Sequence, residues 1–227
     1  MWDWTRDGDL KNAYGALSRF EKILLFLWAS VLVLSRLADD SQTYMFVGKV
    51  LGAAGLSYDT AFTFLSVLVL GIFLTRPDFI KTVFARPRFD FKILWSSWWA
   101  LALVAVLTVL GVYSAFLVYS CNEVVVSMGR TALSAKAVDR LFEALNEEVA
   151  FRLALFYAVS LISRSGGFIF SVFFFALAHG NNNCYAHNML FAGVLYQFLV
   201  LWTGSLSAPL VLHLFANSMI YFLSKGF

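Results

Sequence analysis

Long apolar runs recur along this chain and limit what it can fold into more than any other feature of its sequence. With 60% hydrophobic and 14% charged residues, the chain is too apolar to hide such runs in one soluble core. In hydrocarbon, only helices or closed barrels satisfy every backbone group. The runs lack the two-residue alternation of barrel strands, so helices remain. The sequence therefore predicts an all-α, polytopic transmembrane helix bundle of about seven spans. The predicted spans are Ile23–Leu37, Thr60–Thr75, Ile93–Tyr119, Ala137–Ile162, Gly166–His179, Met189–Thr203 and Ala208–Leu223.

Two further segments accompany these spans. Tyr44–Leu56 is apolar apart from Lys49 and predicts either an eighth span or an interfacial helix. Residues 1–21 are polar and no cleavage site follows the first apolar run, so we expect that span to stay in the mature protein. Within residues 1–21, Leu10–Phe20 has the pattern of an amphipathic helix on the membrane surface. We treat residues 1–227 as a single membrane domain, in which residues 137–223 carry the motifs described below.

Basic residues lie beside the predicted spans, and the net charge is only +3. We interpret them as topology signals and expect no nucleic-acid partner. Arg76–Lys92 is the most basic short loop, and the positive-inside rule places it in the cytoplasm. By alternation of the spans, Cys121, Cys184 and His179 then fall toward the outer face. The two cysteines are either bridged or free, and the sequence leaves both states open.

Two adjacent carboxylates and an arginine interrupt the apolar segment Ala137–Ile162. Charges at this depth of a membrane are costly and persist where they meet a partner or a wet cavity. Glu148 and Arg152 are four residues apart on one helical face, whereas Glu147 is turned by about 100° from Glu148. A structural ion pair explains Glu148 and Arg152, but it leaves Glu147 unexplained.

Histidines occur in two later apolar segments. His179 follows Phe175 by four residues, and Asn217 follows His213 by the same interval, so each pair shares one helical face. Taken alone, His179 is better explained as a packing or interfacial residue than as a catalyst, and the His213–Asn217 pair is better explained by hydrogen bonds between helices. The third histidine, His187, follows a run of asparagines, and we assign it no role.

The ordered combination of these residues changes the interpretation. Glu-Glu-x-x-x-Arg, then Phe-x-x-x-His, then His-x-x-x-Asn resembles the CPBP intramembrane peptidases, a family that includes type II CaaX prenyl endopeptidases and bacteriocin-processing enzymes. The resemblance covers roughly Arg140 to Leu223. It implies a glutamic-type peptidase in which Glu147 is the base that activates water, His179 assists it, and His213 with Asn217 stabilises the oxyanion. The supporting residues would be Glu148, Arg152 and Phe175.

A zinc site is the alternative use of the same side chains. Glu147, His179 and His213 have the donor types of a His/His/Glu site. However, there is no His-Glu-x-x-His element, the donors come from three separate segments, and Asn217 is a better hydrogen-bond donor than a zinc ligand. We favour a mechanism without metal or other cofactor.

The resemblance also implies a class of substrate. We expect an endopeptidase that cleaves a protein or peptide near its C-terminus, with a tail in or beside the bilayer. The tail is either a CaaX-type prenylated one or the sorting tail of an exported protein, and an outward-facing site favours the latter. The short chain favours a multi-pass protein of a prokaryotic inner or plasma membrane. Two other functions stay open: a non-catalytic bacteriocin self-immunity protein on the same fold, and a small proton-coupled transporter that uses Glu147 and Glu148.

Overall fold

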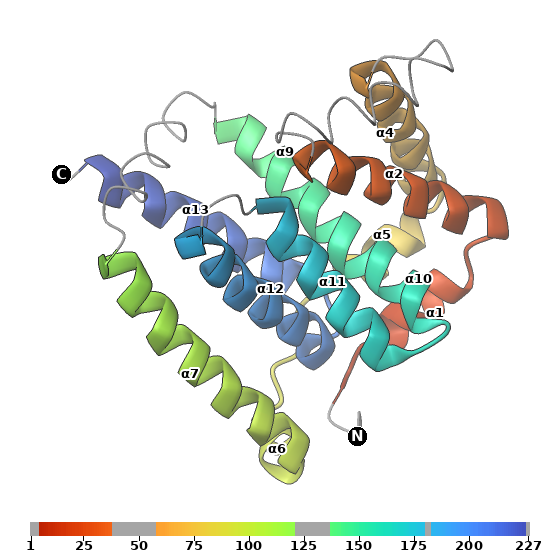
Figure 1. Cartoon of the computed structure of the whole chain (residues 1–227). Coiled ribbons are helices and arrows are strands. Elements are labelled where there is room, and N and C mark those ends of the chain that lie inside the picture. The colour runs from red at the N-terminus through yellow and green to blue at the C-terminus, as the bar shows by residue number, and fades with distance from the viewer. Residues whose placement is uncertain (1–4, 38–57, 121–136, 180–182, 226–227) are drawn as a thin grey trace.

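The computed structural model describes residues 5–37, 58–120, 137–179 and 183–225, and every regular element within these ranges is a helix (Figure 1). The all-α prediction is confirmed. Among these described helices, none combines the length and the apolarity needed to cross a bilayer. The helices are α1 (Gly8–Gly15), α2 (Arg19–Leu37), α4 (Tyr58–Thr75), α5 (Pro77–Val83), α6 (Phe91–Ser96), α7 (Trp98–Ser120), α9 (Ala137–Glu147), the π-helix η1 (Glu148–Leu155), α10 (Phe156–Ser160), α11 (Arg164–His179), α12 (Asn183–Thr203) and α13 (Ser207–Lys225).

Local sequence signals explain where several helices begin. Before α2, the backbone N–H of Ser18 donates to the Glu21 carboxylate at 2.7 Å, and the N–H of Glu21 donates to the Ser18 hydroxyl at 3.2 Å. This reciprocal pair is a capping box. Helix α5 begins with Pro77, whose fixed φ suits the first helical position. The Ser163 hydroxyl accepts the N–H of Gly166 at 3.1 Å and so caps the start of α11.

The prediction of one surface helix over Leu10–Phe20 is wrong in two respects. Helix α1 ends at Gly15, and Phe20 belongs to α2, because the capping box at Ser18 starts a new helix. The apolar face of α1 is also buried within the protein. Tyr14, for example, is only 2% exposed and stacks on Tyr157 of α10 with ring centroids 5.6 Å apart.

Other predicted boundaries also change in the structure. The span Ile93–Tyr119 is divided at Ser97 into α6 and α7, and Ala137–Ile162 is divided into α9, η1 and α10. The loop Arg76–Lys92 contains the short helix α5. Tyr44–Leu56 lies outside the described residues. So do Cys121 and the side chain of Cys184.

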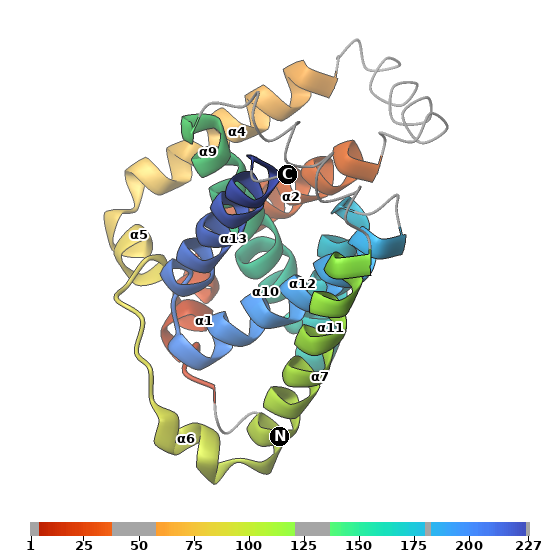
Figure 2. The ribbon, with the colours of Figure 1, turned by 90° about the vertical axis from the view of Figure 1, so that its left-hand side faces the viewer.

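Helix η1 lies at the centre of the bundle. It contacts α2, α9, α11 and α12, and all eight of its residues are buried. Figures 1 and 2 show α7 at one edge beside α12, and α4 on the other side beside α2. Both edge helices expose apolar side chains, among them Leu74 of α4 and Val109 of α7.

Three chain segments meet at one end of the bundle. The backbone N–H of Arg6 donates to the carbonyl of Leu201 at 2.7 Å, and that of Leu206 donates to the carbonyl of Val83 at 2.9 Å. Between these contacts, Gly204 has φ +67°, and a Cβ there would lie 2.4 Å from the carbonyl oxygen of Arg6. Only glycine permits both this backbone conformation and this approach.

Candidate active site

Glu147 is the last residue of α9, at the point where the α-helix changes into the π-helix η1. Its carboxylate is buried, and its Oε2 lies 3.1 Å from Nε2 of His179 and 3.6 Å from Nε2 of His213. The two histidines come from the C-terminal end of α11 and from the middle of α13. Three helices thus bring one carboxylate oxygen between two imidazole nitrogens.

The hydrogen bonds of His179 restrict where its protons lie. Its Nδ1 is 2.8 Å from the backbone carbonyl of Phe175, one turn earlier on α11. A carbonyl only accepts, so Nδ1 carries a proton and donates it. The 3.1 Å contact between Nε2 and Glu147 Oε2 then needs one further proton, which resides on either the imidazole or the carboxyl group. His179 and Glu147 therefore form a proton-sharing pair.

His213 contacts both glutamates, one through each ring nitrogen. Its Nδ1 lies 2.9 Å from Glu148 Oε1, and its Nε2 faces Glu147. The imidazole stacks on Tyr196 with centroids 5.1 Å apart and an interplanar angle of 25°. The ring of Phe175 approaches it nearly edge-on, with an interplanar angle of 80°. These contacts fix the plane of the imidazole.

The second glutamate belongs to a fully buried ion pair. Arg152 Nε lies 3.5 Å from Glu148 Oε2, and both side chains have 0% exposure. The guanidinium lies 4.4 Å from the ring centroid of Phe175 and 5.7 Å from that of Tyr196, both within cation–π range. It also donates from Nη1 to the Ser171 hydroxyl at 3.3 Å. The pairing expected from the four-residue spacing is present.

The charges of this cluster do not balance when both glutamates are ionised. Two carboxylates, Glu147 and Glu148, then face one guanidinium, that of Arg152. Burying an uncompensated charge is strongly unfavourable, so one additional proton is expected in the cluster. The atoms placed to hold it are Nε2 of His179, Nε2 of His213 and Oε2 of Glu147.

Asn217 is the one predicted site residue that stands apart. It lies one turn beyond His213 on α13 and is partly buried, and its side chain makes no hydrogen bond to any residue in the described part of the chain. The structure brings the other predicted residues into one cluster, and their catalytic roles stay predictions. That cluster comprises Glu147, Glu148, Arg152, Phe175, His179 and His213.

Three further residues of this cluster were missed by the sequence analysis. Ser171 donates to the Phe151 carbonyl at 2.8 Å or to Oε1 of the buried Gln197 at 3.0 Å. Tyr196 stacks on His213. Gln197 interrupts an otherwise apolar run, a signal that was available in the sequence. A serine or a tyrosine among aromatic residues carries no such signal.

The zinc alternative concerns the same donor types within the described residues. No group of three or more His, Cys, Asp or Glu among them is arranged to hold a metal ion. The two Nε2 atoms around Glu147 are nevertheless donors of the type that zinc uses. Both the metal-free and the zinc hypotheses therefore stay predictions.

Comparison with known proteins gives one match. Residues 130–219 match the family model described as type II CAAX prenyl endopeptidase Rce1-like. This segment is less than half of the chain, but it contains every residue of the cluster and Asn217. No curated protein and no solved structure matches the chain.

Proposed function

Because residues 130–219 match the family model of Rce1-like type II CAAX prenyl endopeptidases, we propose that this chain is an intramembrane endopeptidase that cleaves a protein or peptide substrate near its C-terminus. Protease activity follows at the level of the family. The glutamate-based mechanism and the intramembrane setting are the finer parts of the proposal. The single observation that carries the mechanism is the position of Glu147 Oε2 between two imidazole Nε2 atoms, at 3.1 and 3.6 Å.

In the proposed reaction, Glu147 is the general base. It takes one proton from water as the water oxygen adds to the carbonyl carbon of the scissile peptide bond. His179, which shares a proton with Glu147, orients the carboxylate and compensates its change of charge. The C–N bond then breaks, and the proton on Glu147 passes to the departing amine. The products are a new carboxyl terminus and a new amino terminus.

His213 and Asn217 are proposed to stabilise the tetrahedral oxyanion. His213 Nδ1 faces Glu148, and when the additional proton of the cluster lies on Nε2 of His213, that atom is a donor beside Glu147. Asn217 lies one turn further along α13 with an amide that has no partner in the described part of the chain. Donors aimed at a developing oxyanion are worth about 3 kcal/mol each. Glu148 and Arg152 hold His213 in place.

The intramembrane setting is supported by the surface of the bundle. Helices α4 and α7 expose rows of apolar side chains, which a bilayer would cover. The most exposed members are 50–71% accessible: Phe64, Val67, Leu70, Leu74, Val106, Val109 and Val112. We therefore propose that the protein is an integral, multi-pass membrane protein whose partners are the bilayer and a substrate tail.

Replacement of Glu147 by glutamine tests the mechanism. Glu147→Gln keeps the shape of the side chain but removes its basicity, so we expect turnover to fall by at least about 100-fold while the protein stays folded. Glu143→Gln is the matched control, since Glu143 is exposed and lies one turn earlier on α9. Near-normal cleavage by purified Glu147→Gln protein contradicts the mechanism.

The substrates for this assay also separate the two proposed substrate classes. One peptide ends in a farnesylated CaaX sequence, and the other carries an unprenylated hydrophobic C-terminal tail. Cleavage of the first alone assigns CaaX processing, and cleavage of the second alone assigns the processing of sorting tails. If neither peptide is cleaved and cells lacking the protein become sensitive to a bacteriocin, the self-immunity alternative replaces the peptidase.

The zinc alternative is tested on the same active protein. We expect elemental analysis to find far less than one equivalent of zinc, and strong chelators to leave turnover unchanged. Stoichiometric zinc whose removal stops turnover contradicts the metal-free mechanism. Glu147 would then be a zinc ligand or the base for a zinc-bound water.

A further inference from the structure

Positive charge is concentrated at the end of the bundle where the N-terminal segment, the α5–α6 connection and the α12–α13 turn meet. We call this the basic end and define it as residues 5–22, 76–92, 164 and 203–207. It carries ten Lys or Arg and five Asp or Glu, against 17 and 14 in the whole chain. Four of its five acids already face a cation, in the pairs Arg6–Asp90, Arg76–Glu21, Lys81–Asp78 and Arg164–Asp7.

A pocket of about 680 Å³ opens at the basic end. Its wall comes from α1, the end of α5, residues 85–88 and the turn at Gly204. Four cations line it, namely Arg6, Lys81, Arg86 and Arg88, together with one carboxylate, Asp9. The Asn12 amide supplies a neutral hydrogen-bonding group on the same wall, whereas the hydroxyls of Thr82 and Thr203 donate to backbone carbonyls. The pocket is therefore polar and carries an excess of positive charge.

Two of these cations are available to a ligand. Arg6 and Lys81 pair with Asp90 and Asp78. Arg86 and Arg88 are exposed, and the side chain of neither forms an ion pair or a hydrogen bond within the part of the chain that the structure describes. The backbone N–H of Arg88 donates to the carbonyl of Thr203 at 3.3 Å and so fixes this arginine to the α12–α13 turn.

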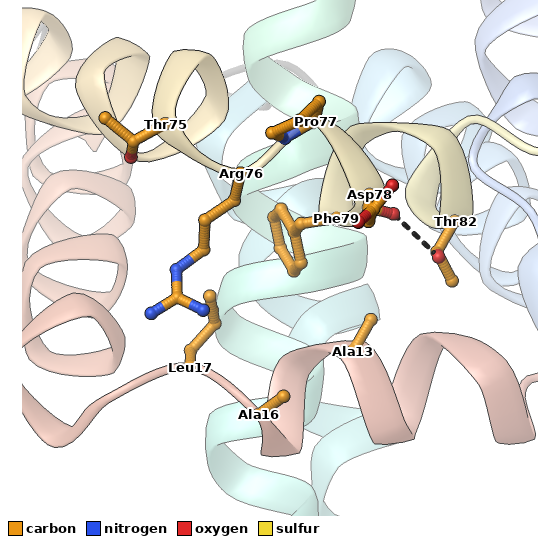
Figure 3. Close-up of a pocket in the computed structure, with 9 residues that line it drawn as sticks. All are labelled: Ala13, Ala16, Leu17, Thr75, Arg76, Pro77, Asp78, Phe79 and Thr82. Carbon is orange, nitrogen blue, oxygen red and sulfur yellow. Dashed lines mark hydrogen bonds between the residues drawn. The ribbon is translucent and has the colours of Figure 1, made fainter.

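A neighbouring pocket of about 350 Å³ provides a contrast (Figure 3). It shares Ala13 and Thr82 with the larger pocket, and Arg76 is the only cation among its described lining residues. In Figure 3, Arg76 extends across this pocket toward the end of α1. There it makes two hydrogen bonds to Glu21, at 2.6 and 3.0 Å, so its charge is already compensated. The excess charge therefore belongs to the larger pocket.

We propose that the pocket lined by Arg86 and Arg88 binds the phosphate group of an anionic membrane lipid. Planar guanidinium groups bind phosphate oxygens through two parallel hydrogen bonds, and two arginines with the Asn12 amide nearby provide such a site. A lipid is favoured over free phosphate because exposed aromatic side chains follow the arginines directly, as at a membrane interface. These are Phe89, Phe91, Trp95 and Trp98, with 54–73% exposure.

The inference rests on the membrane setting of the proposed function but not on its chemistry. The test measures binding by titration calorimetry on the full-length protein in a non-ionic detergent. The probes are dioctanoyl-phosphatidylglycerol, dioctanoyl-phosphatidylcholine and inorganic phosphate. Inactive Glu147→Gln protein is titrated alongside the wild type. Binding by both proteins supports a lipid site whether or not the peptidase proposal survives.

Two double variants make the test specific. Arg86→Gln/Arg88→Gln removes the two available cations of the pocket. Lys11→Gln/Lys92→Gln removes the same charge from exposed lysines of the basic end that do not line it. We expect one phosphatidylglycerol per wild-type chain, an affinity reduced at least about tenfold in the arginine variant, and little change in the lysine variant. The unfolding midpoint without lipid checks that both variants are folded.

Three results would overturn the inference. Equal weakening by both double variants means that only the general positive field attracts the lipid. Equal affinity for phosphatidylcholine means that anionic character is not recognised. Inorganic phosphate that binds as tightly as phosphatidylglycerol, and displaces it, identifies free phosphate as the ligand and rejects a lipid site.

Discussion

Arg152 is a guanidinium with no exposed surface, which is unusual for the side chain that is hardest to deprotonate. Its charge is offset by Glu148 and by the faces of Phe175 and Tyr196. Within the described residues, its Nε and Nη2 atoms make no hydrogen bond. The buried charge of Arg152 is therefore stabilised more by charge and ring contacts than by hydrogen bonds. The buried charge of Glu148 is in turn compensated by Arg152.

Loss of Arg152 should destabilise the fold. Arg152→Ala leaves Glu148 buried without its cation, which typically costs about 3–5 kcal/mol. We expect a lower yield of folded protein and a lower unfolding midpoint in detergent. The matched control is Lys81→Ala, because Lys81 and Asp78 form a pair that is largely exposed to solvent, and such pairs contribute little. Equal midpoints for the two variants would show that the buried pair is not required for stability.

The residues around Glu147 show what sequence reasoning can reach. Spacing alone placed Glu148 near Arg152, because residues four apart share a helical face. Spacing could not predict that His179 and His213 both face the same oxygen of Glu147. That contact depends on how α11 and α13 are positioned relative to the end of α9. The family resemblance supplied this step. Tyr196, which stacks on the ring of His213, was not predicted, because an aromatic residue in an apolar helix has the same sequence pattern as a core residue.

Among the elements, the π-helix η1 and the short helix α5 were not indicated by the sequence, and η1 bears on the candidate site. A π-helix contains an extra residue per turn and is stabilised by tertiary packing, so local propensity gives no sign of it. Here it follows Glu147 directly and carries Glu148 and Arg152. The 100° offset that we assumed between the two glutamates holds only for a regular α-helix. Such π-turns occur often at functional sites.

Helix α1 was predicted as amphipathic, but its partner was misidentified. The pattern of Leu10 and Tyr14 shows which face is apolar, yet it does not distinguish a bilayer from another helix. In the structure, that face packs on α5 and α10. Tyr14 is buried there, and burial raises the pKa of its phenol from 10 to about 12.

This pKa predicts how stability depends on alkaline pH. Above pH 10 the unfolded chain releases the Tyr14 proton, whereas the folded protein keeps it up to about pH 12. The stability contribution is therefore complete below pH 10 and is lost between pH 10 and about 12, by at most about 1.4 kcal/mol per pH unit. We expect unfolding midpoints of Tyr14→Phe protein to fall less steeply than wild type over this range. Parallel curves would show that Tyr14 does not titrate with unfolding.

At the scale of the whole molecule, the two ends of the bundle differ. The basic end gathers the N-terminal segment, residues 76–92 and the α12–α13 turn through backbone hydrogen bonds. Helix α11 begins at the basic end with Arg164, which pairs with Asp7. It runs away from the basic end and finishes at His179. The basic loop and the His179 end of the candidate site therefore lie toward opposite ends of the bundle. Which end faces the cytoplasm stays a prediction.

Cysteine labelling decides this orientation. Helix α7 ends at Ser120 and α12 begins at Asn183, both away from the basic end (Figures 1 and 2). Alternation of the predicted spans places Cys121 and Cys184 on the outer side if the basic loop is cytoplasmic. A membrane-impermeant thiol reagent applied to intact, reduced cells should label either cysteine, and a variant with both replaced by serine gives the background.

Labelling only after permeabilisation would place the basic end outside and the candidate active site toward the cytoplasm. Substrates with cytosolic prenylated tails would then be favoured over exported proteins. Labelling of intact cells favours exported substrates instead, because the His179 end of the candidate site then lies toward the outer face. The same experiment, repeated without reduction, asks whether the two cysteines are bridged. Protection of both cysteines that reductant removes indicates a disulfide, which is expected only in an oxidising compartment.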